Sequence, residues 1–205
     1  MSHILLVKIE MKKIEAVYRD ILHTFFTERK LLFRQKDLAE KLSCSVSTVF
    51  HALEAPRRIG AIRVTGRNFS LTDAEKLLTY WATRRNLSRD VLYETHAPGS
   101  AAQREGLMPP EIIFGACSAY RMLFGETPAD YEKVIVYAAS ADPVRARFPK
   151  LKGPANIMAL QADPLLASYG ATTPPVQIFV DLWNLPDWYA QDFRKALWRR
   201  LAKEG

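Results

Sequence analysis

The sequence predicts an α+β protein made of two domains. Residues 36–71 follow a pattern of two short helices, a tight turn and two strands around a glycine. Residues 112–203 instead alternate helices and strands. The charge is also uneven, because residues 30–72 hold eight Lys and Arg against three acidic residues, which is +5 of the net charge of +7. The expected parts are a basic domain over 1–72, a connector helix over 73–88, and a C-terminal α+β domain with a small mixed sheet over 89–205.

The first domain is expected to begin with a core helix. Residues 1–10 fit either a strand or the start of a helix, and their sequence does not decide between the two. Over residues 12–28 the apolar side chains keep helical spacing, which predicts a helix. Residues 30–33 are expected to form a small strand that pairs with the later hairpin.

Two short helices follow. The first, over residues 36–42, has one apolar face, and the second is expected to be capped by Ser45, whose hydroxyl can accept from an amide one turn in. The residues that would pack the two helices together are Leu38, Ala39, Leu42, Val49, Ala52 and Leu53. The residues of the second helix that face outward are Val46, Ser47, Phe50, His51 and Glu54. Two apolar side chains on an outward face need an explanation, and DNA is a candidate.

A basic hairpin completes this domain. Pro56 lacks an amide donor and is expected to interrupt the second helix. Alternation over residues 61–71 predicts two strands, joined at 65–68 by turn-forming residues. Arg63 and Arg67 would meet phosphates or a minor groove there. This order of elements is that of a winged helix-turn-helix, a DNA-binding fold.

The second domain follows a predicted connector helix over residues 73–86, with Thr72 as its cap and Glu75 completing a capping-box pattern. Residues 97–100 and 108–110 are expected to be loops. The remaining expected elements are a short strand at 91–93, a helix over 112–124, a strand over 133–138, a helix over 141–148, a strand over 155–161, a helical turn at 164–168, a strand over 176–182 and a helix over 188–203.

In the second domain GACSAYRMLFG (115–125) precedes KVIVYA (133–138), and ADPLLA (162–167) precedes VQIFVDLWNLPDWYAQDFRKAL (176–197). These segments resemble the AbiEi-type antitoxins, transcriptional regulators of type IV toxin–antitoxin systems. With the winged helix in front, the resemblance covers most of the chain from about residue 12. It implies an N-terminal domain that represses its own operon and a C-terminal domain that neutralises a nucleotidyltransferase-like toxin.

The resemblance also implies which residues meet DNA. The positions that meet bases correspond to Val46, Ser47 and His51, and those that meet phosphates to Ser45, Thr48 and Phe50. None of the base positions holds Arg, Lys, Asn or Gln, so binding would depend on phosphate charge, thymine-methyl contact by Val46 and shape recognition by Arg67. With the basic positions included, the candidate DNA-binding residues are Arg34, Ser45, Val46, Ser47, Thr48, Phe50, His51, Arg57, Arg58, Arg63 and Arg67.

Several classes of site are not expected. No apolar run approaches the roughly 20 residues of a membrane span, and no signal peptide is evident, so we expect a cytoplasmic protein without a membrane partner. Cys44 and Cys117 lie far apart, which argues against a disulfide framework or a zinc site, and no cofactor is expected. Asp163 and Asp181 lack the flanking pattern of a nucleotidyltransferase, so we do not expect an enzyme. The expected partners are double-stranded DNA of the protein's own promoter and the toxin.

Three alternatives stay open. The winged helix would dock a protein if Val46 and Phe50 form an interface. The second domain would be an enzyme if it acts on nucleic acid that the first domain delivers. The chain would be a ligand-responsive transcription factor if the second domain holds a small-molecule pocket.

Overall fold

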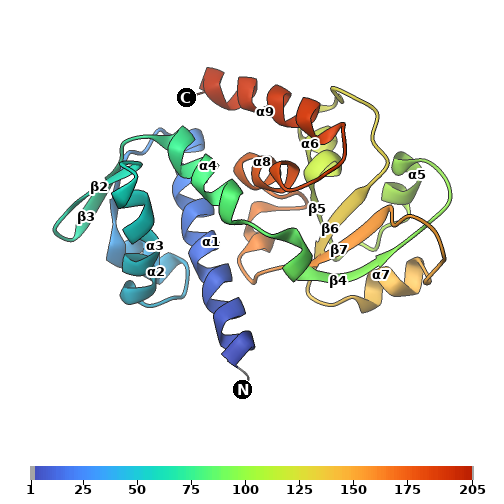
Figure 1. The fold of residues 1–205 in the computed structure, drawn as a ribbon, viewed down its shortest axis with the longest axis horizontal. Helices are drawn as coiled ribbons and strands as arrows, with labels where there is room; N and C mark the ends of the chain where they lie inside the picture. Colours follow the sequence, from blue (N-terminus) through green and yellow to red (C-terminus); the bar gives the residue numbers. More distant parts are fainter. Residues whose placement is uncertain (1–2, 205) are drawn as a thin grey trace. The chain divides into compact units, whose positions relative to one another are not determined.

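A computed structural model describes the backbone of residues 3–204 and the side chains of residues 13–203 (Figure 1). These residues form nine α-helices, a three-stranded antiparallel sheet and a four-stranded mixed sheet, which confirms the predicted α+β class. The chain divides into unit 1, residues 1–84 with 204–205, and unit 2, residues 85–203. Among the described residues, none of the helices combines the length and apolar character that crossing a membrane requires.

Unit 1 packs four helices with a small sheet. Its elements are α1 (His3–Glu28), β1 (Leu32–Arg34), α2 (Gln35–Lys41), α3 (Val46–Arg58), β2 (Ile62–Thr65), β3 (Asn68–Leu71) and α4 (Ala74–Arg84). The strand order is β1-β3-β2, so the strand expected near residue 32 does pair with the hairpin. α1 packs against α3 and α4, and α2 against α3. Residues 3–10, whose state the sequence leaves open, continue α1.

The prediction that Pro56 interrupts the second helix is wrong. α3 continues through the buried Pro56 to Arg58. In a regular helix the amide of residue 56 would donate to the carbonyl of Ala52, and proline has no amide hydrogen. The hydroxyl of Tyr18 on α1 donates to that carbonyl instead, at 2.8 Å. A residue far away in sequence therefore satisfies the acceptor that proline leaves without its usual donor.

This replacement makes a testable prediction about stability. Tyr18→Phe should lower the free energy of unfolding of unit 1 by about 1–2 kcal/mol, because the buried Ala52 carbonyl loses its donor. In a Pro56→Ala background the helix amide is restored, so the same substitution should cost clearly less. Urea unfolding of the two single variants and the double variant measures the coupling. Equal costs in both backgrounds would contradict this explanation.

The start of α4 differs from the sequence-based expectation. Asp73, not Thr72, caps the helix, because its Oδ1 accepts from the Lys76 amide at 2.8 Å. That hydrogen bond also lowers the pKa of the Asp73 carboxyl. The Thr72 hydroxyl instead donates to the carbonyl of Gly60 at 2.9 Å. α4, the expected connector, ends at Arg84 and packs within unit 1 on α1.

Unit 2 has helices on both faces of its mixed sheet. Its elements are η1 (Leu87–Asp90), β4 (Val91–Thr95), α5 (Ala101–Gly106), β5 (Ile113–Gly115), α6 (Ala116–Phe124), β6 (Val134–Ala138), α7 (Asp142–Arg147), β7 (Ile157–Gln161), η2 (Leu166–Tyr169), α8 (Pro175–Trp183) and α9 (Ala190–Glu204). The strand order is β4-β7-β6-β5, with β6 and β7 parallel. All five residues of β6 are buried, as expected for a strand covered on both faces. The short helix α5 has no counterpart in the sequence-based expectation.

The two faces of β6 meet different helices. Val134, Val136 and Ala138 belong to a core that includes Val144 and Phe148 at α7. On the opposite face, Tyr137 reaches Asp181 of α8. Figure 1 shows α7 and α8 on opposite sides of this sheet. The outer edge of β5 is paired as well, because residues 171–173 exchange two backbone hydrogen bonds with Phe114.

The helix predicted over residues 112–124 is two elements. Its first part is the strand β5, which pairs antiparallel with β6, and α6 begins only at Ala116. The chain turns at the extended Gly115 and at Ala116, whose φ of 47° lies in the left-handed region. A side-chain Cβ at Gly115 would lie 2.9 Å from the Tyr137 ring, so glycine is needed there. The sequence pattern missed this break because both parts are apolar.

The strand predicted over residues 176–182 is wrong, because these residues form α8. Pro175 stands in the first turn of this helix, where its missing amide costs nothing. All seven residues from Val176 to Leu182 are buried, so no exposed face marks the helix, and the polar Gln177 and Asp181, one helical turn apart, also lie in the interior. A short apolar run of this kind fits a buried strand or a buried helix equally well. α8 packs against α6.

Candidate nucleic-acid interface

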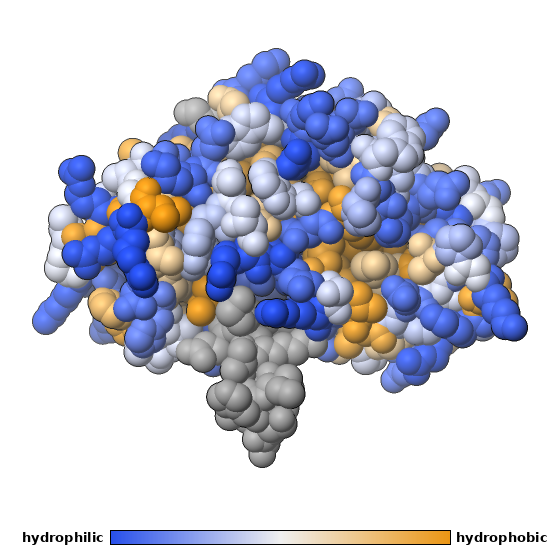
Figure 2. Space-filling view, in the orientation of Figure 1, coloured by the Kyte–Doolittle hydropathy of each residue, from blue (hydrophilic) through white to orange (hydrophobic). Residues whose placement is uncertain are grey.

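The outward face of α3 carries two exposed apolar side chains. Val46 and Phe50 are 47% and 48% exposed and lie one helical turn apart, as the sequence predicts. Ser47 and His51 are exposed beside them, and the Phe50 ring contacts the His51 ring edge-on at 5.7 Å. Figure 2 shows that hydrophilic residues make up most of the visible surface.

The N-terminus of α3 has the expected cap. Ser45 Oγ accepts from the Thr48 amide at 3.0 Å, and the two hydroxyls lie 2.9 Å apart. Ser45 is exposed and Thr48 half-buried, so hydroxyl groups and the first amides of the helix lie at one end of this face. Hydroxyls and amides at helix N-termini are frequent phosphate contacts in protein–DNA complexes.

Exposed arginines lie at the other end of α3 and on the hairpin. Arg57, Arg58, Arg63 and Arg67 are all exposed, and none has an ion-pair partner among the described residues. Gly66, with φ of 62°, allows the tight turn that places Arg67 at the tip. Arg34, at the start of α2, is exposed and lies 3.9 Å from Asp37. Unit 1 thus holds guanidinium groups that are free to meet an anionic partner.

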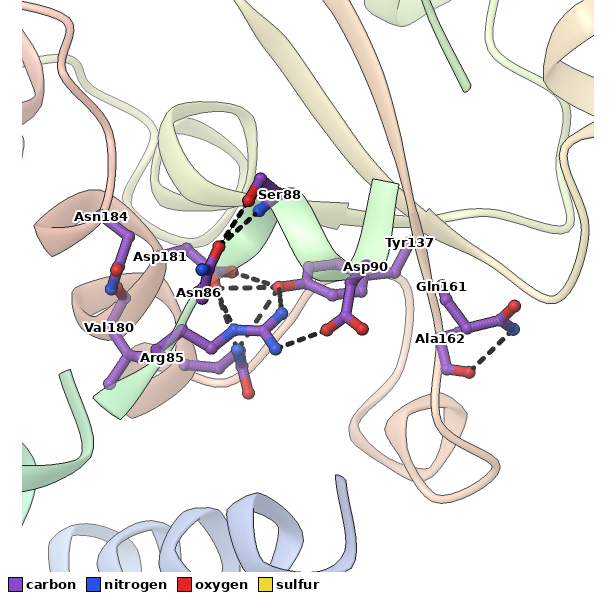
Figure 3. A network of polar contacts seen from close by, with 11 residues as sticks. Arg85, Asn86, Ser88, Asp90, Tyr137, Gln161, Ala162, Val180, Asp181 and Asn184 are labelled. Atoms are coloured by element: carbon purple, nitrogen blue, oxygen red, sulfur yellow. Dashed lines mark hydrogen bonds and ion pairs between the residues drawn. The ribbon is translucent and has the colours of Figure 1, made fainter. Parts of the chain in front are cut away.

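Unit 2 contains a buried polar network that the sequence did not predict (Figure 3). Arg85 donates to Asp90 at 2.5 Å and to the Tyr137 hydroxyl at 3.2 Å. That hydroxyl donates to the Asp181 carboxylate at 2.8 Å, and Gln177 donates to Asp181 at 2.9 Å. All five side chains are buried. They come from three segments, 85–90, β6 and α8, which are far apart in the sequence.

Asp181 links this network to pH. Burial raises the pKa of its carboxyl from 3.8 to about 6, although Arg85 opposes the shift. The folded state therefore binds this proton more tightly than the unfolded state. The stabilisation that comes from binding the proton is lost as pH rises from about 4 through 6. Because Asn does not titrate, the free energy of unfolding of Asp181→Asn should rise relative to that of wild type by up to about 3 kcal/mol over that range. Urea unfolding of both proteins at pH 4, 5, 6 and 7 tests this, and parallel profiles would refute it.

Asp163, named with Asp181 in the sequence analysis, stabilises a turn. Asp163 Oδ1 accepts from the Leu165 amide at 3.1 Å, as expected for a turn. Asp181 lies in the buried network instead. Among the described residues, no group of three or more His, Cys, Asp or Glu is arranged to hold a metal ion.

Unit 2 also has a cavity of about 560 Å³. It lies between the start of α5, the loop 127–132 and the two residues that precede α9, of which Trp188 is 71% exposed. Arg104 in its wall is buried and donates to the carbonyls of Ala97, Gly99 and Glu132. Arg121 pairs with the buried Glu105, which also accepts from the Tyr131 hydroxyl at 2.5 Å. Both guanidinium groups are thus held by the protein itself.

No protein-family model, curated protein or solved structure matches the chain.

Proposed function

We propose that unit 1 is a winged helix-turn-helix module and that the chain is a transcriptional regulator that binds double-stranded DNA at its own promoter. The arrangement of α2, a short turn, α3 and the hairpin β2–β3 supports this proposal. The observation that carries it is the surface of α3. Its outward side chains lie between a hydroxyl-capped N-terminus and the exposed Arg57 and Arg58, and the hairpin that follows carries Arg63 and Arg67. None of these four arginines has an ion-pair partner among the described residues. Clustered free cations of this kind attract a phosphate backbone.

Unit 2 is proposed to bind a second protein, which makes the chain an antitoxin-like repressor. Its resemblance to the AbiEi-type antitoxins suggests a nucleotidyltransferase-like toxin as the partner. The segment KVIVYA is a central strand, β6, but the segment that was expected to be a strand ending in Asp-Leu is the helix α8. The DNA-binding half of the proposal has independent support from unit 1, whereas the toxin depends on the resemblance alone.

The test of DNA binding compares two duplexes over a range of salt. One is the DNA upstream of the protein's own gene, and the other is a scrambled duplex of the same composition. We expect tighter binding to the upstream DNA at about 0.15 M salt and a linear fall of log K with log salt for both. Equal affinity for both duplexes at every salt concentration would reject a promoter-specific regulator.

A second candidate function is a response to a small molecule in unit 2. The cavity of about 560 Å³ favours it, because this volume lies in the usual range for ligand pockets. A ligand found by melting-temperature screening should lose its effect in Trp188→Ala. The same ligand should also change the affinity of the protein for DNA. A ligand that binds the cavity without a regulatory role would leave that affinity unchanged.

A further inference from the structure

We propose that α3 recognises thymine methyl groups in the major groove, so that the bound half-site contains thymines at adjacent or nearby base pairs. This inference rests on the proposed DNA-binding function and adds the chemistry of sequence recognition. Val46 and Phe50 are its recognition residues, which assigns Phe50 to a base instead of the phosphate that the resemblance implies.

The first turns of α3 lack the side chains that make the common bidentate hydrogen bonds to bases. Residues 45–55 contain no Arg, Lys, Asn or Gln, the residues that form bidentate contacts with guanine or adenine. Between its polar N-terminus and Arg57, the helix presents Val46 and Phe50 as its exposed large apolar groups. The thymine C5-methyl is the apolar group that a base pair presents in the major groove. Apolar side chains on a groove-facing helix therefore match that group.

The spacing of the two side chains suits stacked base pairs. Residues i and i+4 of a helix lie about 5–6 Å apart, and successive base pairs rise about 3.4 Å. Two thymines at neighbouring or next-but-one positions would thus each meet one side chain. The one acidic residue on the outward face, Glu54, lies a further turn away and contacts His51 Nδ1 at 3.6 Å.

Charge favours DNA over an apolar protein as the occupant. The apolar pair is followed along the chain by the exposed Arg57 and Arg58, and the hairpin adds Arg63 and Arg67. A partner protein would need to bury or pair these cations, whereas phosphates on both sides of a groove pair with them directly. The apolar pair Val46 and Phe50, together with these exposed arginines, therefore fits a major groove that is rich in thymine.

The experiment replaces thymine by deoxyuridine in the upstream duplex, which removes only the methyl groups. Wild-type protein should bind the deoxyuridine duplex about tenfold more weakly, or about three- to fivefold for each methyl that is buried. The double variant Val46→Ser/Phe50→Ser should bind both duplexes equally, because it lacks the apolar contacts. Since both side chains are exposed, the variant should fold, which circular dichroism checks. Leu107→Ser in unit 2, where Leu107 is 57% exposed, is the matched control and should keep the difference.

The outcomes separate the two proposals. Specific binding that is unchanged by deoxyuridine would overturn thymine recognition and leave the DNA-binding function intact. A deoxyuridine effect that persists in the Val46→Ser/Phe50→Ser variant would also overturn it, because the methyls would then act through DNA shape. Absence of any preference for the upstream duplex would overturn the DNA-binding function itself.

Discussion

Arg85→Met is expected to lower the free energy of unfolding of unit 2 by about 3–5 kcal/mol. The Arg85 guanidinium is buried, lies 2.5 Å from Asp90 and 3.8 Å from Asp181, and donates to Tyr137. Methionine fills similar space but removes the guanidinium group that both buried carboxylates contact. The loss should be larger at pH 8 than at pH 5, because burial raises the pKa of Asp181 and its protonation at low pH removes the need for a cation.

Urea unfolding followed by tryptophan fluorescence measures this loss. Trp183, Trp188 and Trp198 lie in unit 2, and Trp81 lies in unit 1, so the signal reports mainly on unit 2. The matched control is Arg145→Met, which breaks an exposed pair with Asp142 at 3.3 Å. That change should cost less than about 1 kcal/mol. Similar losses in the two variants would show that the buried network does not stabilise unit 2.

Removing the free arginines of unit 1 is expected to have the largest effect on DNA binding. Replacing Arg57, Arg58, Arg63 and Arg67 by alanine should lower affinity on the order of 10²–10³-fold at about 0.1 M salt, if each contacts a phosphate. The slope of log K against log salt should fall by about 3–4, because fewer counterions are released. The scrambled duplex should be affected as strongly as the upstream duplex, since phosphate contacts do not depend on sequence.

A variant with the same change in net charge is the control. Arg89, Arg145, Arg147 and Arg199 are exposed in unit 2, and their replacement by alanine removes four positive charges from that unit. We expect a change in slope below about 1 for this variant, because long-range charge is screened over about 10 Å at 0.1 M salt. An equal fall of the slope in both variants would show that binding depends on the overall charge of the protein. It would argue against unit 1 as the interface.

The sequence predicted the elements that have strong local signals. Asp142-Pro143 starts α7, Ser45 caps α3, and the apolar run at β6 is a strand. Predictions went wrong where an element is buried over most of its length, as at α8, because no exposed polar face remains to show the period. The continuation of α3 through Pro56 was also missed, since its compensating hydroxyl, Tyr18, lies on α1.

The candidate site was predictable in part for the same reason. Helical spacing alone places Val46 and Phe50 on the outer face, and the structure confirms that both are exposed. Their contact with DNA remains a prediction. The network around Arg85 was not predictable, because Tyr137 and Asp181 meet it only when β6 and α8 pack together.

The pairing of residues 171–173 with β5 has a consequence for solubility. With that edge occupied, β4 is the remaining edge strand in the described sheet of unit 2, and Lys150 Nζ donates to its Glu94 carbonyl at 2.5 Å. β4 is five residues long, and its register shifts between Val91 and Tyr93. Short, irregular edges are poor templates for a strand from another molecule. Concentrated wild-type protein should therefore stay free of β-rich aggregates, whereas variants that release residues 171–173 would expose β5 and promote strand-to-strand assembly between molecules.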